Sequence, residues 1–216
     1  MAWAIIGVTA VIFLLQQAMP PREFVATLYA FGLTPAKGLG NTTGFITYSF
    51  LHGGWWHTIS NLWMFWIFSD NIEDVMGPWR FLLFYLLCGV LAGIAHMIAN
   101  PGSLIPVVGA SGAISGVLGA YFLLYPHAKI TTLVFFLFLR LPAALYLGGW
   151  FLLQLFSGLN EGGAGIAWWA HLGGFIAGML LLPFFRTNRP LPARLPEPPT
   201  RLVDDSKDPW GKFRSK

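Results

Sequence analysis

Apolar residues are gathered along the chain into long blocks, which polar and helix-breaking residues separate. Six of these blocks have about the length of a short membrane-spanning helix. They cover residues 2–18, 56–70, 79–98, 109–125, 141–157 and 168–185. We therefore predict an all-α membrane protein, built as a bundle of six transmembrane helices.

Two connections between these blocks need separate interpretation. Residues 19–55 form a long polar segment with apolar patches, which we expect to lie in the membrane interface as short helices. Residues 131–139 are apolar but too short to span, and Pro142 prevents one straight helix from continuing into the next block. We predict that this stretch is an interfacial connection.

Composition supports a membrane location. The chain has 216 residues, of which 56% are hydrophobic and 10% are charged, against about 25% charged in a typical soluble domain. Its single cysteine, Cys88, excludes an internal disulfide framework. The net charge of +4 comes from basic residues clustered near one end, without the interleaved aromatic residues of a nucleic-acid groove. We expect no nucleic-acid partner.

The distribution of basic residues predicts an orientation. Of the 13 Lys and Arg residues, eight lie between Arg186 and Lys216, and Arg80, Lys129 and Arg140 lie in connections on the same side. By the positive-inside rule, both termini are cytoplasmic. We expect residues 1–186 to form the membrane domain and the proline-rich residues 187–216 to form a disordered cytoplasmic tail. No cleavable signal peptide is evident.

Four polar residues occupy equivalent positions in alternate blocks. In the predicted topology the second, fourth and sixth helices all run inward from the non-cytoplasmic side, and near their beginnings they carry His57 and Asn61, Ser111, and His171. Polar groups inside a membrane are costly unless they are paired. We therefore predict that the four residues converge in one site, a few residues below the outer surface.

Glycines on the same helices indicate how close the helices approach. Small residues allow membrane helices to pack closely, and on that interpretation alone Gly112 and Gly116 are a packing motif around Ser111. In the sixth block, however, His171, Gly174 and Gly178 share one helical face. Two glycine-lined helices could bring the His171 imidazole to the Ser111 hydroxyl.

A serine beside a histidine indicates nucleophilic catalysis. A hydroxyl is a weak nucleophile at neutral pH, and an imidazole within hydrogen-bond reach takes its proton and passes it to the leaving group. Candidate donors to the resulting oxyanion are the Ser111 backbone N–H, the Asn61 amide and the His57 imidazole. No acidic residue lies at the same depth, so we predict a Ser–His dyad. A metal bound by His57 and His171 is disfavoured because no carboxylate or thiolate accompanies them, and we expect no metal or cofactor.

The segments HGGWWHTISN, GASG and AHLGG, in this order, resemble those of the rhomboid intramembrane serine proteases. The similarity covers roughly residues 1–186. It implies that Ser111 is the nucleophile, His171 the base, and His57, Asn61 and the Ser111 N–H the oxyanion hole. Gly109 and Gly112 match the glycines that flank the nucleophile. The resemblance also implies that substrate enters beside the fifth helix, where Trp150 and Phe151 form part of a gate. Separately, the Gly-rich composition of residues 157–167 predicts a flexible lid over the site.

One difference from the family leaves the histidine without its usual neighbour. Well-known members place a tyrosine four residues after the nucleophile, where its ring packs on the catalytic histidine, but this chain has Ser115. Either apolar neighbours or a bond from Ser115 could orient His171. His52 is expected to anchor a loop or lie in the membrane interface, and His96 is expected to be structural.

We therefore predict an intramembrane serine endopeptidase that cleaves transmembrane segments of other proteins in the lipid bilayer. One alternative is a catalytically inactive relative that binds membrane helices. Another is a small transporter or channel, which the absence of an evident repeat disfavours. The compact chain resembles prokaryotic members of the family, which implies a plasma membrane. The sequence indicates neither the substrate nor the oligomeric state.

Overall fold

The computed structural model describes residues 1–134, 136–160 and 167–187. The long helices are α1 (Ala2–Gln17), α2 (Pro21–Phe31), α4 (Trp55–Met76), α5 (Pro78–Ala99), α6 (Ser111–Leu124), α7 (Ala143–Asn160) and α8 (Trp168–Phe185). Short helical turns are η1 (Pro35–Gly40), α3 (Gly44–Thr47) and η2 (Tyr48–Phe50). The strands are β1 (Lys129–Val134) and β2 (Leu137–Pro142).

Six of the helices coincide with the six predicted apolar blocks to within a few residues, apart from the longer C-terminal end of α4. Their ability to span a membrane differs, however. Among the described residues, α5 and α8 are long and apolar enough to cross a membrane, whereas α1 and α6 have only 16 and 14 residues. Helices α4 and α7 do not reach the same mean hydropathy because polar residues interrupt them. The count of six spans therefore remains a prediction.

The connection around residues 131–139 is a β-hairpin, an element that the predicted all-α class does not include, in a protein that is otherwise mostly helical. Strands β1 and β2 pair in antiparallel register, from Lys129 opposite Pro142 to Val134 opposite Leu137. Strand β1 is rich in β-branched residues, which favour extended backbone, and Pro142 disfavours a helix that runs into α7. Large exposed side chains on the hairpin, such as Phe138, are consistent with an interfacial position.

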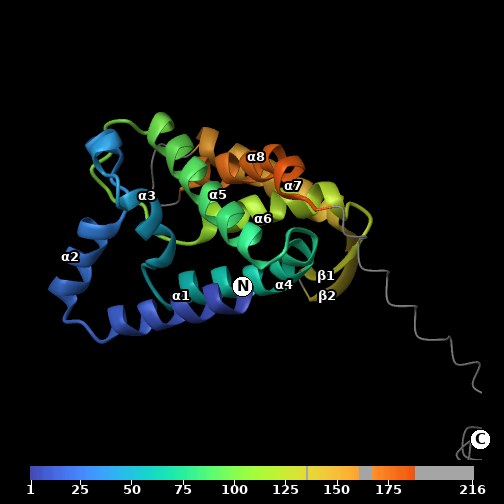
Figure 1. Cartoon of the computed structure of the whole chain (residues 1–216), viewed down its shortest axis with the longest axis horizontal. Helices are drawn as coiled ribbons and strands as arrows, with labels where there is room; N and C mark the ends of the chain where they lie inside the picture. Colours follow the sequence, from blue (N-terminus) through green and yellow to red (C-terminus); the bar gives the residue numbers. More distant parts are fainter. Residues whose placement is uncertain (135, 161–166, 188–216) are drawn as a thin grey trace, which may run out of the picture.

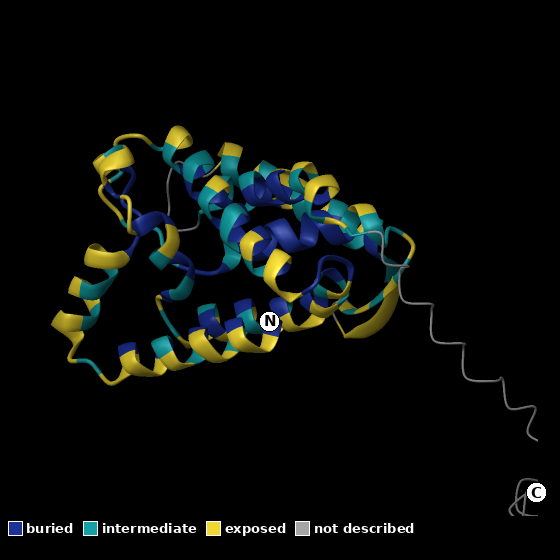
Figure 2. Ribbon diagram, in the orientation of Figure 1, coloured by how far each residue is buried: buried dark blue, intermediate teal, exposed yellow. Residues whose placement is uncertain are grey.

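Helix α6 lies at the centre of the molecule, with α5 and α8 on one side and α4 on the other (Figure 1). Every residue from Gly112 to Tyr121 is buried, and Figure 2 shows this helix as the most continuously buried element. Helix α2 and the short helical turn α3 lie at one end of the molecule, and the β-hairpin lies at the opposite end (Figure 1). The expected short helices between the first two long ones are therefore present.

Glycines set the separation between α6 and α8. A Cβ atom added to Gly174 or Gly178 would overlap the backbone carbonyl of Gly112 or Gly116. A Cβ at Gly119 would in turn overlap the carbonyl of Phe175. The two backbones are thus in direct contact over two turns, as small residues permit between membrane helices. This contact positions the N-terminal ends of α6 and α8 next to each other.

Two polar contacts tie the far ends of the helices together. The Arg80 guanidinium, at the start of α5, donates hydrogen bonds to the carbonyls of Phe184 and Phe185 at the C-terminus of α8, with distances of 2.6 and 3.0 Å. Such a donor satisfies carbonyls that have no intrahelical partner. Thr187 donates to the Val75 carbonyl at 2.6 Å. The predicted disordered tail, beyond Thr187, lies outside the described residues.

Candidate active site

Ser111 and His171 lie within hydrogen-bond distance of each other. The Ser111 Oγ and the His171 Nε2 are 2.8 Å apart. Ser111 is the first residue of α6 and His171 lies in the first turn of α8, so the glycine contact between these helices brings the two side chains together. The structure therefore places a serine hydroxyl beside an imidazole, as the spacing of the glycines predicts.

The opposite side of the His171 ring contacts Gln154. The His171 Nδ1 and the Gln154 Oε1 are 2.7 Å apart, and Gln154 is a buried residue of α7. Neither alternative for the orientation of His171 anticipated this contact. Ser115 is not the partner, because its hydroxyl donates to the Ser111 carbonyl of its own helix at 2.6 Å. The only signal in the sequence was a lone amide within an apolar segment.

Gly109 shapes the backbone that leads into Ser111. Its φ angle is +124°, a conformation that side chains rarely adopt. A Cβ at this position would also lie 2.6 Å from the His57 Nε2. Both observations require glycine, which explains the first glycine of the GASG segment. The turn sets His57 against the residues that precede Ser111.

His52 supports the same backbone segment through a hydrogen bond. It is fully buried, and its Nε2 accepts a hydrogen bond of 3.4 Å from the Ala110 N–H. The Gln16 side chain of α1 holds the His52 backbone through its N–H and its carbonyl, at 3.2 and 3.4 Å. Burial, and to a smaller extent the neighbouring His57, lowers the pKa of His52 to about 4. His52 is therefore neutral near pH 7. Its hydrogen bond with Ala110 anchors this loop, as expected from the sequence.

His57 presents a ring nitrogen as a donor. Its Nδ1 accepts the Gly53 N–H at 3.5 Å, which leaves the proton of the neutral ring on Nε2. That Nε2 lies beside Gly109, two residues before Ser111. An N–H directed at this position is suited to stabilise negative charge that develops next to the nucleophile.

Asn61 lies one helical turn further along α4 and also lines the cavity. One N–H of its amide donates to the His57 carbonyl at 2.6 Å. A primary amide has a second N–H, which can serve another acceptor. The Ser111 backbone N–H is the third candidate donor, because the first N–H groups of a helix have no intrahelical acceptor. The structure therefore brings all four predicted site residues to one place.

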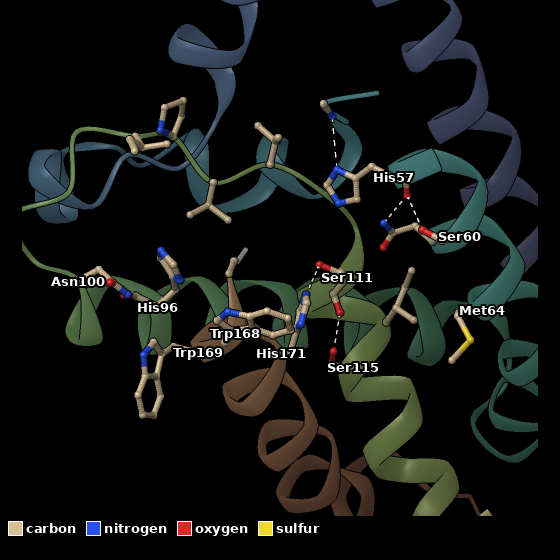
Figure 3. Close-up of a pocket in the computed structure, with 18 of the residues that line it drawn as sticks. His57, Ser60, Met64, His96, Asn100, Ser111, Ser115, Trp168, Trp169 and His171 are labelled. Atoms are coloured by element: carbon tan, nitrogen blue, oxygen red, sulfur yellow. Dashed lines mark hydrogen bonds between the residues drawn. The ribbon is translucent and has the colours of Figure 1, made fainter. Parts of the chain in front are cut away.

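An open cavity of about 730 Å³ surrounds these residues. Figure 3 shows Ser111 and His171 joined by their hydrogen bond at one part of the cavity, with His57 reaching toward them from α4. His96 of α5 and Asn100, which follows α5, line another part of the cavity, although His96 is only 9% exposed. Among the described residues, no three His, Cys, Asp or Glu side chains are grouped as a metal site.

Of the two predicted gate residues, only Trp150 lines the cavity. Its ring lies 6.0 Å from that of His171 and 6.1 Å from that of Phe175, between ring centres. Phe151 instead packs on Phe175, with ring centres 5.0 Å apart, and holds α7 against α8. The predicted lid, residues 157–167, falls mostly outside the described residues.

Comparison with known proteins agrees with this arrangement. The rhomboid domain matches residues 39–188, and this chain belongs to the rhomboid family. That range begins before the candidate oxyanion-hole residues and ends after the helix that carries His171. The order of the three motifs along the chain thus identified the family correctly.

Several curated proteins are similar to this chain. Rhomboid protein 1, mitochondrial, of Saccharomyces cerevisiae is 27% identical over 189 residues, which cover 83% of this chain and 51% of the yeast protein. Presenilin-associated rhomboid-like protein A, mitochondrial, of Danio rerio is 32% identical over 61% of this chain and 34% of its own length. Putative rhomboid protease YdcA of Bacillus subtilis is 37% identical over 35% of this chain and 38% of its own. The chain thus spans about half of these relatives or less.

The relatives bear on the location of the protein. A rhomboid domain indicates a membrane protein. Mitochondrial proteins are prominent among the similar sequences, so the expectation of a prokaryotic plasma membrane is not supported. The orientation of the termini stays a prediction from the positions of the basic residues.

Proposed function

We propose that this protein is an intramembrane serine endopeptidase that cleaves transmembrane segments of other membrane proteins through a Ser111–His171 dyad. The observation that carries the proposal is the 2.8 Å contact between the Ser111 Oγ and the His171 Nε2 on an open cavity. Membership of the rhomboid family and the similarity to a protein named as a putative rhomboid protease support it.

The proposed reaction begins with attack of the Ser111 Oγ on the carbonyl carbon of the scissile peptide bond. His171 takes the hydroxyl proton on Nε2 and then gives it to the leaving amine nitrogen, which breaks the C–N bond. An acyl-enzyme remains on Ser111. A water molecule activated by His171 hydrolyses this ester, which returns the proton to Ser111 and releases the new carboxyl end.

Charge stabilisation in this scheme falls to the residues around the start of α6. The tetrahedral intermediates carry an oxyanion, and the Ser111 N–H, the His57 Nε2–H and the second Asn61 N–H are its proposed donors. Removal of one such preorganised donor typically lowers the rate by about two to three orders of magnitude. The N-terminus of α6 adds the positive end of a helix dipole.

The substrate must present extended backbone to Ser111. A peptide bond within a helix has its carbonyl engaged and its backbone covered, so the substrate helix has to unwind locally near the cavity. Small or helix-breaking residues near the end of its membrane segment should therefore favour cleavage. In the predicted orientation, the cavity opens on the side of the membrane opposite the two termini, which gives water access to the site.

The proposal is tested with purified protein in liposomes and a panel of single-pass reporter proteins. We expect cleavage in or next to the reporter's membrane segment, located by product mass. Ser111→Ala and His171→Ala should each lower kcat by about three orders of magnitude or more. Ser60→Ala is the matched control, since Ser60 lines the same cavity and donates only to the His57 carbonyl.

Two results would contradict the proposal. Cleavage that survives in Ser111→Ala would exclude the assigned nucleophile. A wild-type protein that binds the reporter helices but cuts none of them would favour the inactive, helix-binding alternative.

A further inference from the structure

We propose that Gln154 is a positioning residue for His171: its amide oxygen selects the histidine tautomer that can accept the Ser111 proton. This inference rests on the proposed function, since it concerns the base of that reaction. It assigns a role to a residue of α7 that lies 17 positions before His171 in the sequence and on a different helix.

Gln154 faces the interior from a helix that is otherwise exposed over much of its surface. Ala143, Leu147 and Gln154 are the buried residues of α7, and their spacing of four and seven residues places them on one face. Gln154 is 5% exposed. A buried amide is costly without a hydrogen-bond partner, and the 2.7 Å contact with the His171 Nδ1 supplies one.

This contact decides where the proton of the neutral imidazole resides. A carbonyl oxygen can only accept a hydrogen bond, so His171 must donate from Nδ1. The proton is then on Nδ1, and the lone pair is on Nε2, which lies 2.8 Å from the Ser111 Oγ. In the opposite tautomer, Nε2 would carry a proton and could not accept one from serine. Gln154 therefore favours the reactive form of the base.

The same contact also fixes the direction of the ring. Rotation of the imidazole by half a turn would direct carbon atoms at both Gln154 and Ser111, which would lose both hydrogen bonds. The flanking rings of Trp150 and Trp168, with centres 6.0 and 6.2 Å from that of His171, restrict other tilts. Ring packing and the Gln154 amide thus orient His171 together, in a chain that has Ser115 at the position where well-known family members have a tyrosine.

An amide suits an apolar site better than a carboxylate would. During the reaction His171 carries a positive charge, and the dipole of the Gln154 carbonyl stabilises the proton on Nδ1. An isolated carboxylate in the same place would be a buried charge whenever His171 is neutral, which is costly in a low-dielectric surrounding. A Ser–His dyad without an acidic third residue can therefore still have an oriented histidine.

The experiment compares two replacements that are close to Gln154 in size. Gln154→Met removes the acceptor, and Gln154→Glu keeps one. Each variant is assayed in liposomes for reporter cleavage and, independently, for the rate at which a fluorophosphonate reacts with Ser111. Leu153→Met is the control, because Leu153 lies on the exposed side of α7. Thermal unfolding of every variant is recorded alongside.

We expect Gln154→Met to lower kcat by about ten- to a hundredfold, the range known for groups that orient metal-binding histidines, with little change in KM. Gln154→Glu should recover a substantial part of the loss. If Gln154 merely fills space, the order reverses, because Met is tolerated and a buried Glu is not. The proposal would be overturned if Gln154→Met were as active as wild type. It would also be overturned if Gln154→Glu were no more active than Gln154→Met.

Nitrogen-15 NMR of the histidine rings gives a readout that does not depend on turnover. The His171 signals, assigned by their loss in His171→Ala, should report the Nδ1–H tautomer in wild type and a mixture in Gln154→Met. A wild-type ring protonated on Nε2 would overturn the proposal directly. If wild-type protein shows that Nδ1–H tautomer but neither cleaves a reporter nor reacts at Ser111, the proposed function fails while the Gln154 contact stands.

Discussion

Helix α8 packs against α5, α6 and α7, and its contacts with α6 and α7 differ in kind. Against α6, the backbones touch through Gly112, Gly116, Gly174 and Gly178, with no side chain between them. Against α7, aromatic rings and one amide make the contact, through Trp150 and Phe151 on Phe175 and Gln154 on His171. The first interface has almost no freedom to adjust, whereas side chains at the second can change rotamer.

This difference separates two requirements of the candidate site. The backbone contact between α6 and α8 sets how far Ser111 is from His171. The side-chain contact between α7 and α8 sets how the His171 ring is turned, and it also borders the cavity. A serine and a histidine need both distance and orientation to react, since small displacements of reacting groups are costly in rate. The two interfaces should therefore respond differently to substitution.

The largest effect is expected where the backbones touch. In Gly178→Ala the new methyl group would overlap the Gly116 carbonyl, so α8 must move away from α6. A displacement of about 1 Å would lower kcat by about a hundredfold, and overpacking would lower stability by about 1–3 kcal/mol. Reporter cleavage and thermal unfolding measure the two effects.

Gly149→Ala is the matched control for that substitution. Gly149 lies on α7, and no atom lies within 4 Å of a Cβ built there, so the variant should behave like wild type. Equal activity of Gly178→Ala and Gly149→Ala would show that the glycine contact does not set the catalytic distance.

A smaller effect is expected at the side-chain interface. Phe151→Ala removes the ring that packs on Phe175 and loosens α7 without altering the contact between α6 and α8. If substrate enters beside α7, cleavage of a transmembrane reporter should rise several-fold, while the reaction of Ser111 with a small soluble fluorophosphonate stays nearly constant.

Phe156 is exposed on the same helix, so Phe156→Ala serves as the control. The predicted gate would be contradicted if Phe151→Ala changed both rates in parallel, because access of a small probe does not require a lateral opening.

The smallest effect is expected at Ser115. Its hydroxyl donates to the carbonyl of Ser111 within α6 and does not contact the His171 ring nitrogens. Ser115→Ala should leave cleavage nearly unchanged and alter stability by less than about 1 kcal/mol. A loss of activity as large as that of Gln154→Met would instead make Ser115 part of the orientation of the base.

The sequence allowed much of this arrangement to be predicted because it depends on local spacing. Glycines at helical intervals near Ser111 and His171 indicate a close helix contact, and the hydropathy blocks indicate where the helices lie. The contact between Gln154 and His171 could not be derived in the same way. It joins two helices whose relative rotation depends on packing across the whole bundle, and one amide in an apolar segment does not reveal its partner.

The β-hairpin illustrates a second limit of the sequence pattern. Residues 131–139 are apolar enough for a short helix or a strand, and periodicity does not distinguish the two in so short a run. The proline at position 142 indicated an interruption without indicating what precedes it. The hairpin forms because Lys129–Val134 pairs with Leu137–Pro142, and a pattern of single residues does not show which segments will pair.

The most direct test of the central claim is the reaction of Ser111 itself. Purified protein is treated with a fluorophosphonate, and peptide mass spectrometry locates the adduct in wild type, His171→Ala and Ser60→Ala. The account predicts an adduct on Ser111 that forms at similar rates in wild type and Ser60→Ala and is nearly absent in His171→Ala. An adduct on another serine, or an unchanged rate on Ser111 without His171, would contradict the claim that the glycine-packed helices bring a nucleophile to its base.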